Sequence, residues 1–472
     1  MSSTLYEDKY FLNSKDALEE SLKENYVLAP NKQVKGLQIC YYDGEVLKNA
    51  PKNCINVPFE NFVKYFSKTK NRIPTEFCDK DNIVMYQLFK DSLLEVNKII
   101  EKKIQKLEQK IKELKPNFQD KKLRVFAFGC RETVLIKYIV ENIIEAAKRL
   151  GLEVYLHKQT NNMQSCSKLH YLKALYKFNP HMTININHLN NSFLNKYIYN
   201  FIWFQDQMPV LLNNERIGKR ERDYFFHLTE HLTFYLRKKG ISSNYQPFCI
   251  DTDTYKIRNL RKRNNIIVFI GSSYKKMFDS INNKDKYKIL QKVLKIYLKK
   301  GYMSNKERKT FIKNNSFNDN GIIHIYNYIE RDLLLLHIVN MKLGYKIEIY
   351  GHGWEVYSEL HQYYKGTLKY GKDISKVYNN AKYCLVLGGY VMQQRTLEGA
   401  ASGAIPLVFD VRASNADFDQ ECFDKSLVFF NNPSNLYDIL QKEYTKDLSC
   451  IVQKNSYLNF VKKILNVVGK NK

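Results

Sequence analysis

The sequence contains no CxxC pair, no long apolar run and no recognisable secretory leader. Its nine cysteines are scattered, which argues against a zinc module or a disulfide framework and fits a reducing compartment. No apolar stretch approaches the roughly 18 residues that a membrane-spanning helix needs. The N-terminal stretch MSSTLYEDKYFLNSKDALEE lacks the basic start and apolar core of a signal peptide. These absences predict a cytoplasmic protein.

Acidic residues are scarce relative to basic ones, with 48 Asp and Glu against 75 Lys and Arg and a net charge of +27. This excess favours a polyanionic neighbour such as nucleic acid, anionic lipid or a phosphorylated substrate. The alternative is a compositional bias toward Lys, Asn and Ile. The chain has no compact recognition motif with interleaved aromatics, so no specific nucleic acid is expected.

The length and composition indicate a multidomain globular protein. Hydrophobic residues make up 44% and charged residues 26% of the 472, which are ordinary values for a folded chain. Single hydrophobic cores stop growing near roughly 250–300 residues, so two or three domains are expected.

Residues 382–410, KYCLVLGGYVMQQRTLEGAASGAIPLVFD, predict a strand, a glycine turn, a helix and a second strand. Gln394, Arg395 and Glu398 fall on one face near the start of the predicted helix 392–402. The N-terminus of a helix after a glycine turn favours anions, and a carboxylate one turn further in can accept hydrogen bonds from a ribose. The pattern suggests a nucleotide diphosphate site. An ordinary βαβ unit with a solvated helix face is the alternative.

A seven-residue repeat between residues 93 and 114 predicts a long helix that ends at Pro116. Its apolar positions, with one asparagine among them, are Leu93, Asn97, Ile100, Ile104, Leu107, Ile111 and Leu114. Isoleucine and a single buried asparagine at a, with leucine or isoleucine at d, favour a parallel two-stranded coiled coil and hence a homodimer. The alternative is an amphipathic helix lying on its own chain.

From residue 121 onward, apolar runs alternate with helical patterns, which is typical of parallel α/β sheets. The predicted strands are 123–128, 153–156, 182–186, 201–204, 224–227, 246–249, 266–270, 346–350, 383–387 and 405–409. We therefore expect two doubly wound, Rossmann-like domains at 121–255 and 262–440, facing a cleft between their carboxyl strand edges. An unassigned extension covers 1–92, the heptad helix 93–115, and a C-terminal helix 441–472.

Residues 284–313 form a strongly basic segment, with eleven Lys or Arg against two acidic residues. Ile289, Val293 and Tyr297 belong to an apolar stripe along it, so the helix could lie on an anionic membrane surface, peripheral to the inner face of the cell membrane. The alternative is an ordinary surface helix that covers the sheet.

Four motifs together resemble the CgeB-like glycosyltransferases of GT-B fold over about residues 121–440. They are WFQDQMP at 203–209, FIGSSYKK at 269–276, YGHGWE at 350–355 and QQRTLEGAASGAIPLV at 393–408. The resemblance implies a GT-B-like α/β fold in which the C-terminal domain binds a nucleotide sugar. The N-terminal domain would present the acceptor, which could be a protein, a glycan or a cell-surface glycoconjugate.

The resemblance also implies roles for residues of the C-terminal domain. Glu398 matches the carboxylate that holds the donor ribose, and Gln394 and Arg395 match positions near the diphosphate. The other implied donor-binding residues are Gly271, Ser272 and Lys275 or Lys276 at the phosphates, and Gly351, Gly353 and Trp354 at the base or sugar. For Trp354, interdomain packing is the alternative.

Asp206, just after the predicted strand 201–204, is the candidate general base for an acceptor hydroxyl. A retaining mechanism would need no such base, and Asp206 could instead bind the acceptor or cap a loop. Asp251 and Asp253 form a DTD sequence that binds metal in a different glycosyltransferase fold. Because Arg395 and the lysines can supply positive charge, we expect no metal and no cofactor besides the nucleotide-sugar substrate.

Two other functions remain open at this stage. A sugar-nucleotide epimerase on the same fold would share the donor pocket and bind no second acceptor. A basic nucleic-acid-binding protein would use the positive charge and leave the cleft without chemistry.

Overall fold

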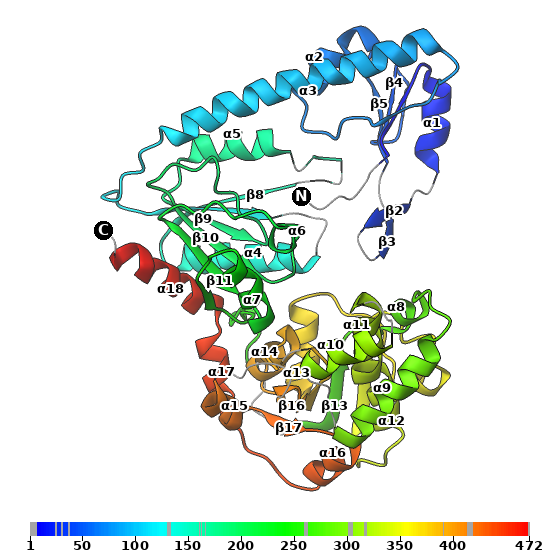
Figure 1. The fold of residues 1–472 in the computed structure, drawn as a ribbon, viewed down its shortest axis with the longest axis vertical. Coiled ribbons are helices and arrows are strands. Elements are labelled where there is room, and N and C mark those ends of the chain that lie inside the picture. Colours follow the sequence, from blue (N-terminus) through cyan, green and yellow to red (C-terminus); the bar gives the residue numbers. More distant parts are fainter. Residues whose placement is uncertain are drawn as a thin grey trace. The chain divides into compact units, whose positions relative to one another are not determined.

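The computed structural model describes residues 7–23, 26–29, 32–35, 38–129, 134–159, 161, 163–165, 167–258, 263–300, 305–315, 319–389, 391–412 and 419–470. The chain divides into two compact units, each described here by itself (Figure 1). Unit 1 comprises Met1–Phe226, Tyr235–Asn244 and Val467–Lys472, and unit 2 comprises His227–Phe234 and Tyr245–Asn466. The extension and the heptad helix thus belong to the same unit as most of the first Rossmann-like domain.

The first 80 residues form a small parallel sheet with an aromatic core. Its strand order is β5-β4-β1-β6, with β5 at Cys54–Asn56, β4 at Cys40–Tyr42, β1 at Lys9–Phe11 and β6 at Glu76–Phe77. Helices α1 (Ser14–Leu22) and α2 (Phe62–Phe66) and the antiparallel pair β2 (Tyr26–Ala29) and β3 (Lys32–Lys35) complete this part. The four strands have only two or three residues each, so no alternating pattern is visible in the sequence.

Helix α3 (Ile83–Lys112) contains the predicted heptad and packs against α2 and α5 of its own chain. Val96 is fully buried whereas Asn97 is exposed, so the asparagine does not fill an apolar seam. Ile104, Leu107 and Leu114 pack against the buried core around α5. The structure therefore supports the amphipathic helix on its own chain, because the stripe expected to face a partner is already covered.

The larger sheet of unit 1 has six strands in the order β12-β11-β10-β9-β7-β8. The strands are β7 (Arg124–Gly129), β8 (Glu153–Lys158), β9 (Met182–Ile186), β10 (Tyr199–Phe204), β11 (Asp223–His227) and β12 (Ser243–Tyr245). The helices between them are α4 (Val134–Arg149), α5 (Lys168–Phe178), α6 (Pro209–Leu212) and α7 (Glu230–Lys238). The predicted strand 246–249 is wrong: the strand ends at Tyr245, and Pro247 has no N–H to donate to a ladder.

The sheet of unit 2 repeats the same winding with five strands in the order β14-β13-β15-β16-β17, all parallel. They are β13 (Asn264–Ile270), β14 (Lys346–Tyr350), β15 (Ala381–Val386), β16 (Ile405–Phe409) and β17 (Val428–Phe430). In both units the first strand lies between the second and the third. The predicted α/β class with two doubly wound, Rossmann-like sheets is confirmed, and its topological switch point in unit 2 lies between β13 and β15.

In the described part of the chain, eleven α-helices and one π-helical turn follow β13. They are α8 (Lys275–Asp279), α9 (Lys286–Lys300), α10 (Asn305–Asn314), α11 (Asp319–Asn327), a π-helical turn (Tyr328–Leu333), α12 (Leu334–Val339), α13 (Lys372–Asn380), α14 (Gln394–Ala401), α15 (Gln420–Ser426), α16 (Pro433–Leu440), α17 (Ser449–Lys454) and α18 (Tyr457–Lys470). The predicted C-terminal helix is thus at least two helices, α17 and α18. The last residues of α18 belong to unit 1.

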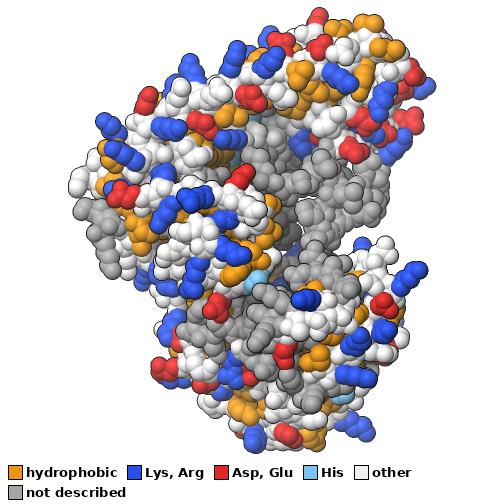
Figure 2. Space-filling model, viewed as in Figure 1, with side chains coloured by type: hydrophobic (Ala, Val, Ile, Leu, Met, Phe, Trp, Pro, Cys, Tyr) orange, Lys and Arg blue, Asp and Glu red, His pale blue; other side chains and the backbone are white. Residues whose placement is uncertain are grey.

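The basic segment 284–313 forms α9 and α10 rather than one helix. Ile289 and Val293 of α9 are buried in the core of unit 2, and Tyr297 packs against it. The apolar stripe is therefore covered by its own chain, as the surface-helix alternative expects. On the face drawn in Figure 2, the described Lys and Arg side chains are scattered, with acidic side chains among them.

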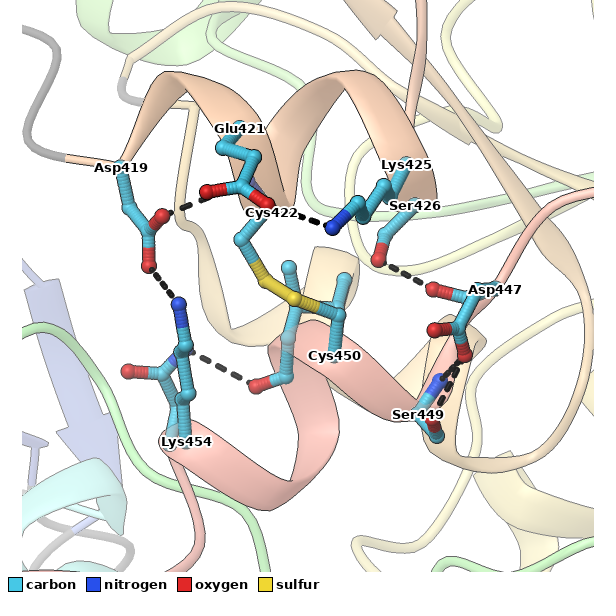
Figure 3. Close-up of a disulfide and its surroundings, with 11 residues drawn as sticks. Asp419, Glu421, Cys422, Lys425, Ser426, Asp447, Ser449, Cys450 and Lys454 are labelled. Atoms are coloured by element: carbon cyan, nitrogen blue, oxygen red, sulfur yellow. Dashed lines mark hydrogen bonds and ion pairs between the residues drawn. A yellow bond between two sulfur atoms is a disulfide. The ribbon is translucent and has the colours of Figure 1, made fainter.

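The structure bears on two features that the sequence lacks, a membrane-spanning helix and a disulfide framework. Among the described residues, no helix is long and apolar enough to cross a membrane. Cys422 and Cys450 are joined by a disulfide between α15 and α17 (Figure 3). One disulfide is not the framework that the sequence argues against, and the separation of 28 residues leaves no local signal of this pairing.

Candidate functional site

The candidate site lies at the carboxyl edge of the unit 2 sheet, where the loops after β13 and β14 run side by side. The N–H of Gly271 donates to the Tyr350 carbonyl over 2.9 Å, and the N–H of Ser273 donates to the His352 carbonyl over 2.9 Å. Gly351 has φ +135°, and a Cβ there would lie 2.1 Å from the Gly271 carbonyl oxygen. Only glycine fits this approach, so the glycines of both motifs serve one joint.

Trp354 holds the same joint and is not exposed to a ligand. Its indole N–H donates to the Gly271 carbonyl over 2.6 Å, and its side chain is fully buried with an edge against Phe269. A Cβ on Gly353 would lie 3.2 Å from the Cβ of Ser273, which again brings the two loops together. Because the side chain of Trp354 is fully buried, it has no exposed surface for the predicted contact with a base or sugar. The side chain packs within unit 2.

The π-helical turn Tyr328–Leu333 fastens onto this joint through Asp332. The fully buried carboxylate of Asp332 accepts hydrogen bonds from the Tyr274 N–H at 2.9 Å, the Tyr357 hydroxyl at 2.8 Å and the Ser273 hydroxyl. Burial raises the pKa of Asp332, and these three donors oppose the rise. Turns of this type inside helices frequently mark functional sites.

Arg331, the residue before Asp332 in the same turn, places a guanidinium over the loop after β13. Its Nη1 donates to the Ser272 carbonyl over 3.2 Å, and its guanidinium lies 4.6 Å from the centre of the Tyr274 ring. Its Nε is buried without a hydrogen-bond partner. Within the described ranges no carboxylate oxygen lies at ion-pair distance from Arg331. Its positive charge acts at longer range on the neighbouring carboxylates of Glu330 and Asp332 and opposes the rise that burial causes in the pKa of both.

Glu330 faces the glycine turn after β15. Its carboxylate accepts a hydrogen bond from the Tyr297 hydroxyl, and the Gly389 backbone contributes a second one. Gly388 and Gly389 have φ of +68° and +75°, and a Cβ on Gly388 would lie 3.4 Å from the Cβ of Glu330. Burial raises the pKa of Glu330. The π-helical turn therefore contacts the loops at the carboxyl ends of both β13 and β15, the two strands that flank the switch point.

Helix α14 follows this glycine turn and contains the predicted ribose and diphosphate residues. Glu398 is fully buried and accepts a hydrogen bond from Arg395, while its Oε1 has no hydrogen-bond partner of good geometry. Burial raises the pKa of Glu398, and Arg395 opposes the rise. Gln394 donates to the Cys249 carbonyl over 3.3 Å, and its Oε1 is likewise buried and unpaired. The three residues do share one region, as predicted, but Arg395 is committed to Glu398.

Lys275 does not face the loop as predicted, because its ammonium lies 2.5 Å from Asp279 Oδ1, one turn further along α8. Lys276 is exposed. Asp251 accepts a hydrogen bond from the Asp253 N–H over 3.2 Å and closes a local turn. The residues that the structure describes contain no group of three His, Cys, Asp or Glu side chains suited to a metal ion, and metal independence stays a prediction.

Asp206 belongs to unit 1, whereas every other predicted site residue belongs to unit 2. It is exposed just beyond β10, and its carboxylate accepts a hydrogen bond from the Asn187 side chain over 2.9 Å. The Asn187 side-chain oxygen in turn accepts from the N–H of Gln205 and of Asp206. Asp206 is thus an oriented, solvent-accessible carboxylate at the end of a parallel strand.

Comparison with known proteins gives no family for this chain. No family model matches it, and no curated protein matches it. The resemblance to CgeB-like proteins therefore rests on the four motifs alone.

Similar solved structures are glycosyltransferases. AviGT4, involved in avilamycin A biosynthesis, is 9% identical, with 73% of this chain and 96% of that chain covered and a TM-score of 0.42. An α-glucosyltransferase in complex with UDP and a 13-mer DNA is 11% identical, with 74% and 100% covered and a TM-score of 0.41. The catalytic domain of starch synthase IV from Arabidopsis thaliana, bound to ADP and acarbose, is 8% identical, with 71% and 95% covered and a TM-score of 0.36.

Sequence reasoning missed the π-helical turn, which contributes Glu330, Arg331 and Asp332. A signal was present: these three charged residues interrupt the otherwise mainly apolar stretch 322–339. Three successive charged side chains on a helix that covers a sheet are costly to bury unless each is paired or hydrogen-bonded.

Proposed function

We propose that the chain is a glycosyltransferase that moves a sugar from a nucleotide-sugar donor to an acceptor hydroxyl, of the GT-B type and CgeB-like. The observation that carries the proposal is the position of the Arg331 guanidinium. This guanidinium stands at the carboxyl edge of a parallel sheet, beside the switch point, without a carboxylate at ion-pair distance among the described residues. Open α/β sheets bind ligands at this place.

The chemistry of glycosyl transfer suits this arrangement. As the glycosidic bond to the donor breaks, negative charge develops on the departing nucleotide diphosphate and must be stabilised. Arg331 offers a planar fork of donors, which pairs with phosphate oxygens bidentately. Gly271 and Ser272 lie beside its guanidinium, and the glycine turn of Gly388 and Gly389 lies against the neighbouring Glu330. The glycine backbone can approach phosphates closely, because glycine has no side chain.

Glu398 is the proposed partner of the donor ribose, and Gln394 Oε1 offers a second acceptor beside it. Tyr255 and Gln394 also interact with the Glu398 carboxylate, so the ribose would replace these interactions. Glu398 and Gln394 are both buried, so this contact requires local opening of the loop that precedes α14. Asp206 is the proposed general base if the transfer inverts the configuration, since it is exposed and oriented by Asn187. The acceptor, a protein, a glycan or a cell-surface glycoconjugate, would meet unit 1.

The test is release of nucleotide diphosphate from a panel of UDP-, GDP- and dTDP-sugars and ADP-glucose, measured once with a metal chelator and once with added divalent metal. We expect slow hydrolysis of one donor, which an acceptor accelerates and Arg331→Gln abolishes. Conversion of the donor into an isomer without nucleotide release would indicate an epimerase. No turnover of any donor, with or without divalent metal, would contradict the proposal.

A further inference from the structure

A cavity of about 520 Å³ lies in unit 2, and Met392, in the loop that precedes α14, is the one lining residue that it shares with the loops of the candidate site. It is formed by α15, α17, α18 and the chain just after β12. Its lining residues are Tyr245, Pro247, Met392, Asp419, Phe423, Ile451, Lys454, Asn455, Asn459, Lys462, Lys463 and Asn466. The volume falls in the range of small-molecule sites.

The lining divides into a cationic part and an apolar part. Lys454, Lys462 and Lys463 supply three ammonium groups against the single carboxylate of Asp419. Lys454 pairs with Asp419 at 3.0 Å, and Lys463 donates to the neutral Gln246 side chain over 3.1 Å. Lys462 has no ion pair with the described residues. Two ammonium charges are therefore left without a counter-ion.

The apolar part suits a ring or a short chain. Phe423 and Ile451 are buried among the cavity walls, and Tyr245 adds a second aromatic ring. A ligand with an anionic group and an apolar moiety would match both parts. Two uncompensated lysines fit the dianionic charge of a phosphate better than the single charge of a carboxylate.

The walls of the cavity are tied together covalently. Cys422 on α15 and Cys450 on α17 form the disulfide (Figure 3). The residue that follows each cysteine, Phe423 on α15 and Ile451 on α17, lines the cavity. The Lys454–Asp419 pair and the Ser426 hydroxyl bonded to the Asp447 carbonyl connect the same two segments. The chain that follows α17 pairs with Ile250, so α17 is also anchored to the connection between the units' sheets.

We propose that this cavity is a second binding site, for a phosphorylated small molecule with an apolar moiety, and that the Cys422–Cys450 disulfide holds its walls at binding distance. A dithiol would open the link: it transfers two electrons and two protons to the two sulfurs, the S–S bond breaks, both cysteines become thiols, and the dithiol closes into a cyclic disulfide. The helices would then be held by the ion pair and hydrogen bonds alone. The proposal does not depend on glycosyl transfer.

The test uses phenyl phosphate, titrated by calorimetry into the oxidised full-length protein. We expect one saturable site that Lys462→Ala combined with Lys463→Ala weakens about tenfold or more, since each lysine contributes a charged contact. Lys376→Ala, an exposed lysine of unit 2 outside the cavity, is the matched control and should change nothing. Arg331→Gln should also leave this binding unchanged, which separates the cavity from the donor site.

Reduction supplies the second arm. Treatment with dithiothreitol, or Cys450→Ser, should weaken phenyl phosphate binding several-fold while the fold persists by circular dichroism. Absence of saturable binding, or binding that survives the double lysine substitution, overturns the site. Binding lost only in Arg331→Gln assigns the probe to the donor site and overturns the proposal as well. Unchanged affinity after reduction overturns the role of the disulfide.

Discussion

The indole N–H of Trp354 donates to the carbonyl of Gly271 over 2.6 Å, and this bond fixes the loop after β14 onto the loop after β13. Two motifs that are 83 residues apart thus form one joint. The π-helical turn depends on the same joint, because Asp332 accepts a hydrogen bond from the N–H of Tyr274 in the loop after β13.

Trp354→Phe removes the donor and leaves the Gly271 carbonyl without its indole partner. We expect a loss of about 1–3 kcal/mol in the free energy of unfolding, the usual cost of an unsatisfied buried group, measured by urea titration. The control is Tyr437→Phe, at a half-exposed ring in α16, which should leave stability unchanged. Equal stability of Trp354→Phe and the wild type would show that the bond contributes nothing.

Gly351→Ala tests the close approach of the two loops. A Cβ would lie 2.1 Å from the Gly271 carbonyl, so the joint must open, and we expect a loss well above the ~1–2 kcal/mol of backbone strain alone. Gly344→Ala is the matched control, because Gly344 also has a positive φ, +70°, but nothing lies within 4 Å of its Cβ position. Equal losses for the two variants would refute the steric account.

The buried carboxyl of Asp332 predicts a pH dependence. Its pKa is raised by burial, so the folded protein holds this proton more tightly than the unfolded chain does. The stability that this group contributes is present below the unfolded pKa of about 4 and is lost as pH rises through the folded pKa. The stability of the wild type minus that of Asp332→Asn should therefore decrease as pH rises above about 4.

Chemical denaturation between pH 3.5 and 7 measures this difference. Glu359→Gln, at an exposed carboxylate, is the control and should give no such trend. A difference that grows with pH would mean that the three hydrogen bonds to Asp332 outweigh its burial.

The Arg395–Glu398 pair is expected to be structural as well as functional. Glu398→Ala leaves a mostly buried guanidinium without its carboxylate, and we expect a loss of about 2–4 kcal/mol, below the fully buried case because Arg395 retains some exposure. Glu421→Ala breaks the exposed pair with Lys425 at the same type of contact and should have no measurable effect. Wild-type stability of Glu398→Ala would contradict the burial of this pair.

Much of the fold could be predicted from the sequence, and the reason is visible in single strands. Strands 182–186, 346–350 and 405–409 were predicted to the residue. Residues 405–409 are a continuous apolar run, as expected of a parallel strand buried on both faces, whereas 182–186 and 346–350 alternate apolar and polar residues. The prediction of a strand at 246–249 was wrong because these residues form a buried, irregular connection around Pro247. The heptad was a true amphipathic signal, but the stripe alone does not say whether a partner or the chain itself covers it.

The candidate site was only partly predictable. Gly271, Gly351 and Glu398 stand where the motifs placed them, at strand ends and on α14. Trp354 was misassigned because a tryptophan that follows a glycine turn can either stack on a ligand or be buried as a packing residue, and the sequence does not distinguish the two. Arg331 was missed because no periodicity reveals a π-helical turn, which shifts the register of the side chains that follow it.

The most direct test of the central claim is calorimetric binding of UDP, GDP, ADP and dTDP, each compared with its nucleoside, to the wild type and to Arg331→Gln. We predict that one diphosphate binds and that Arg331→Gln weakens it by about 10- to 100-fold, the worth of one or two charge-assisted hydrogen bonds, while nucleoside binding is unchanged. Arg258→Gln, at an exposed arginine of unit 2, is the control. Binding of no diphosphate, or equal binding by Arg331→Gln, would contradict the account.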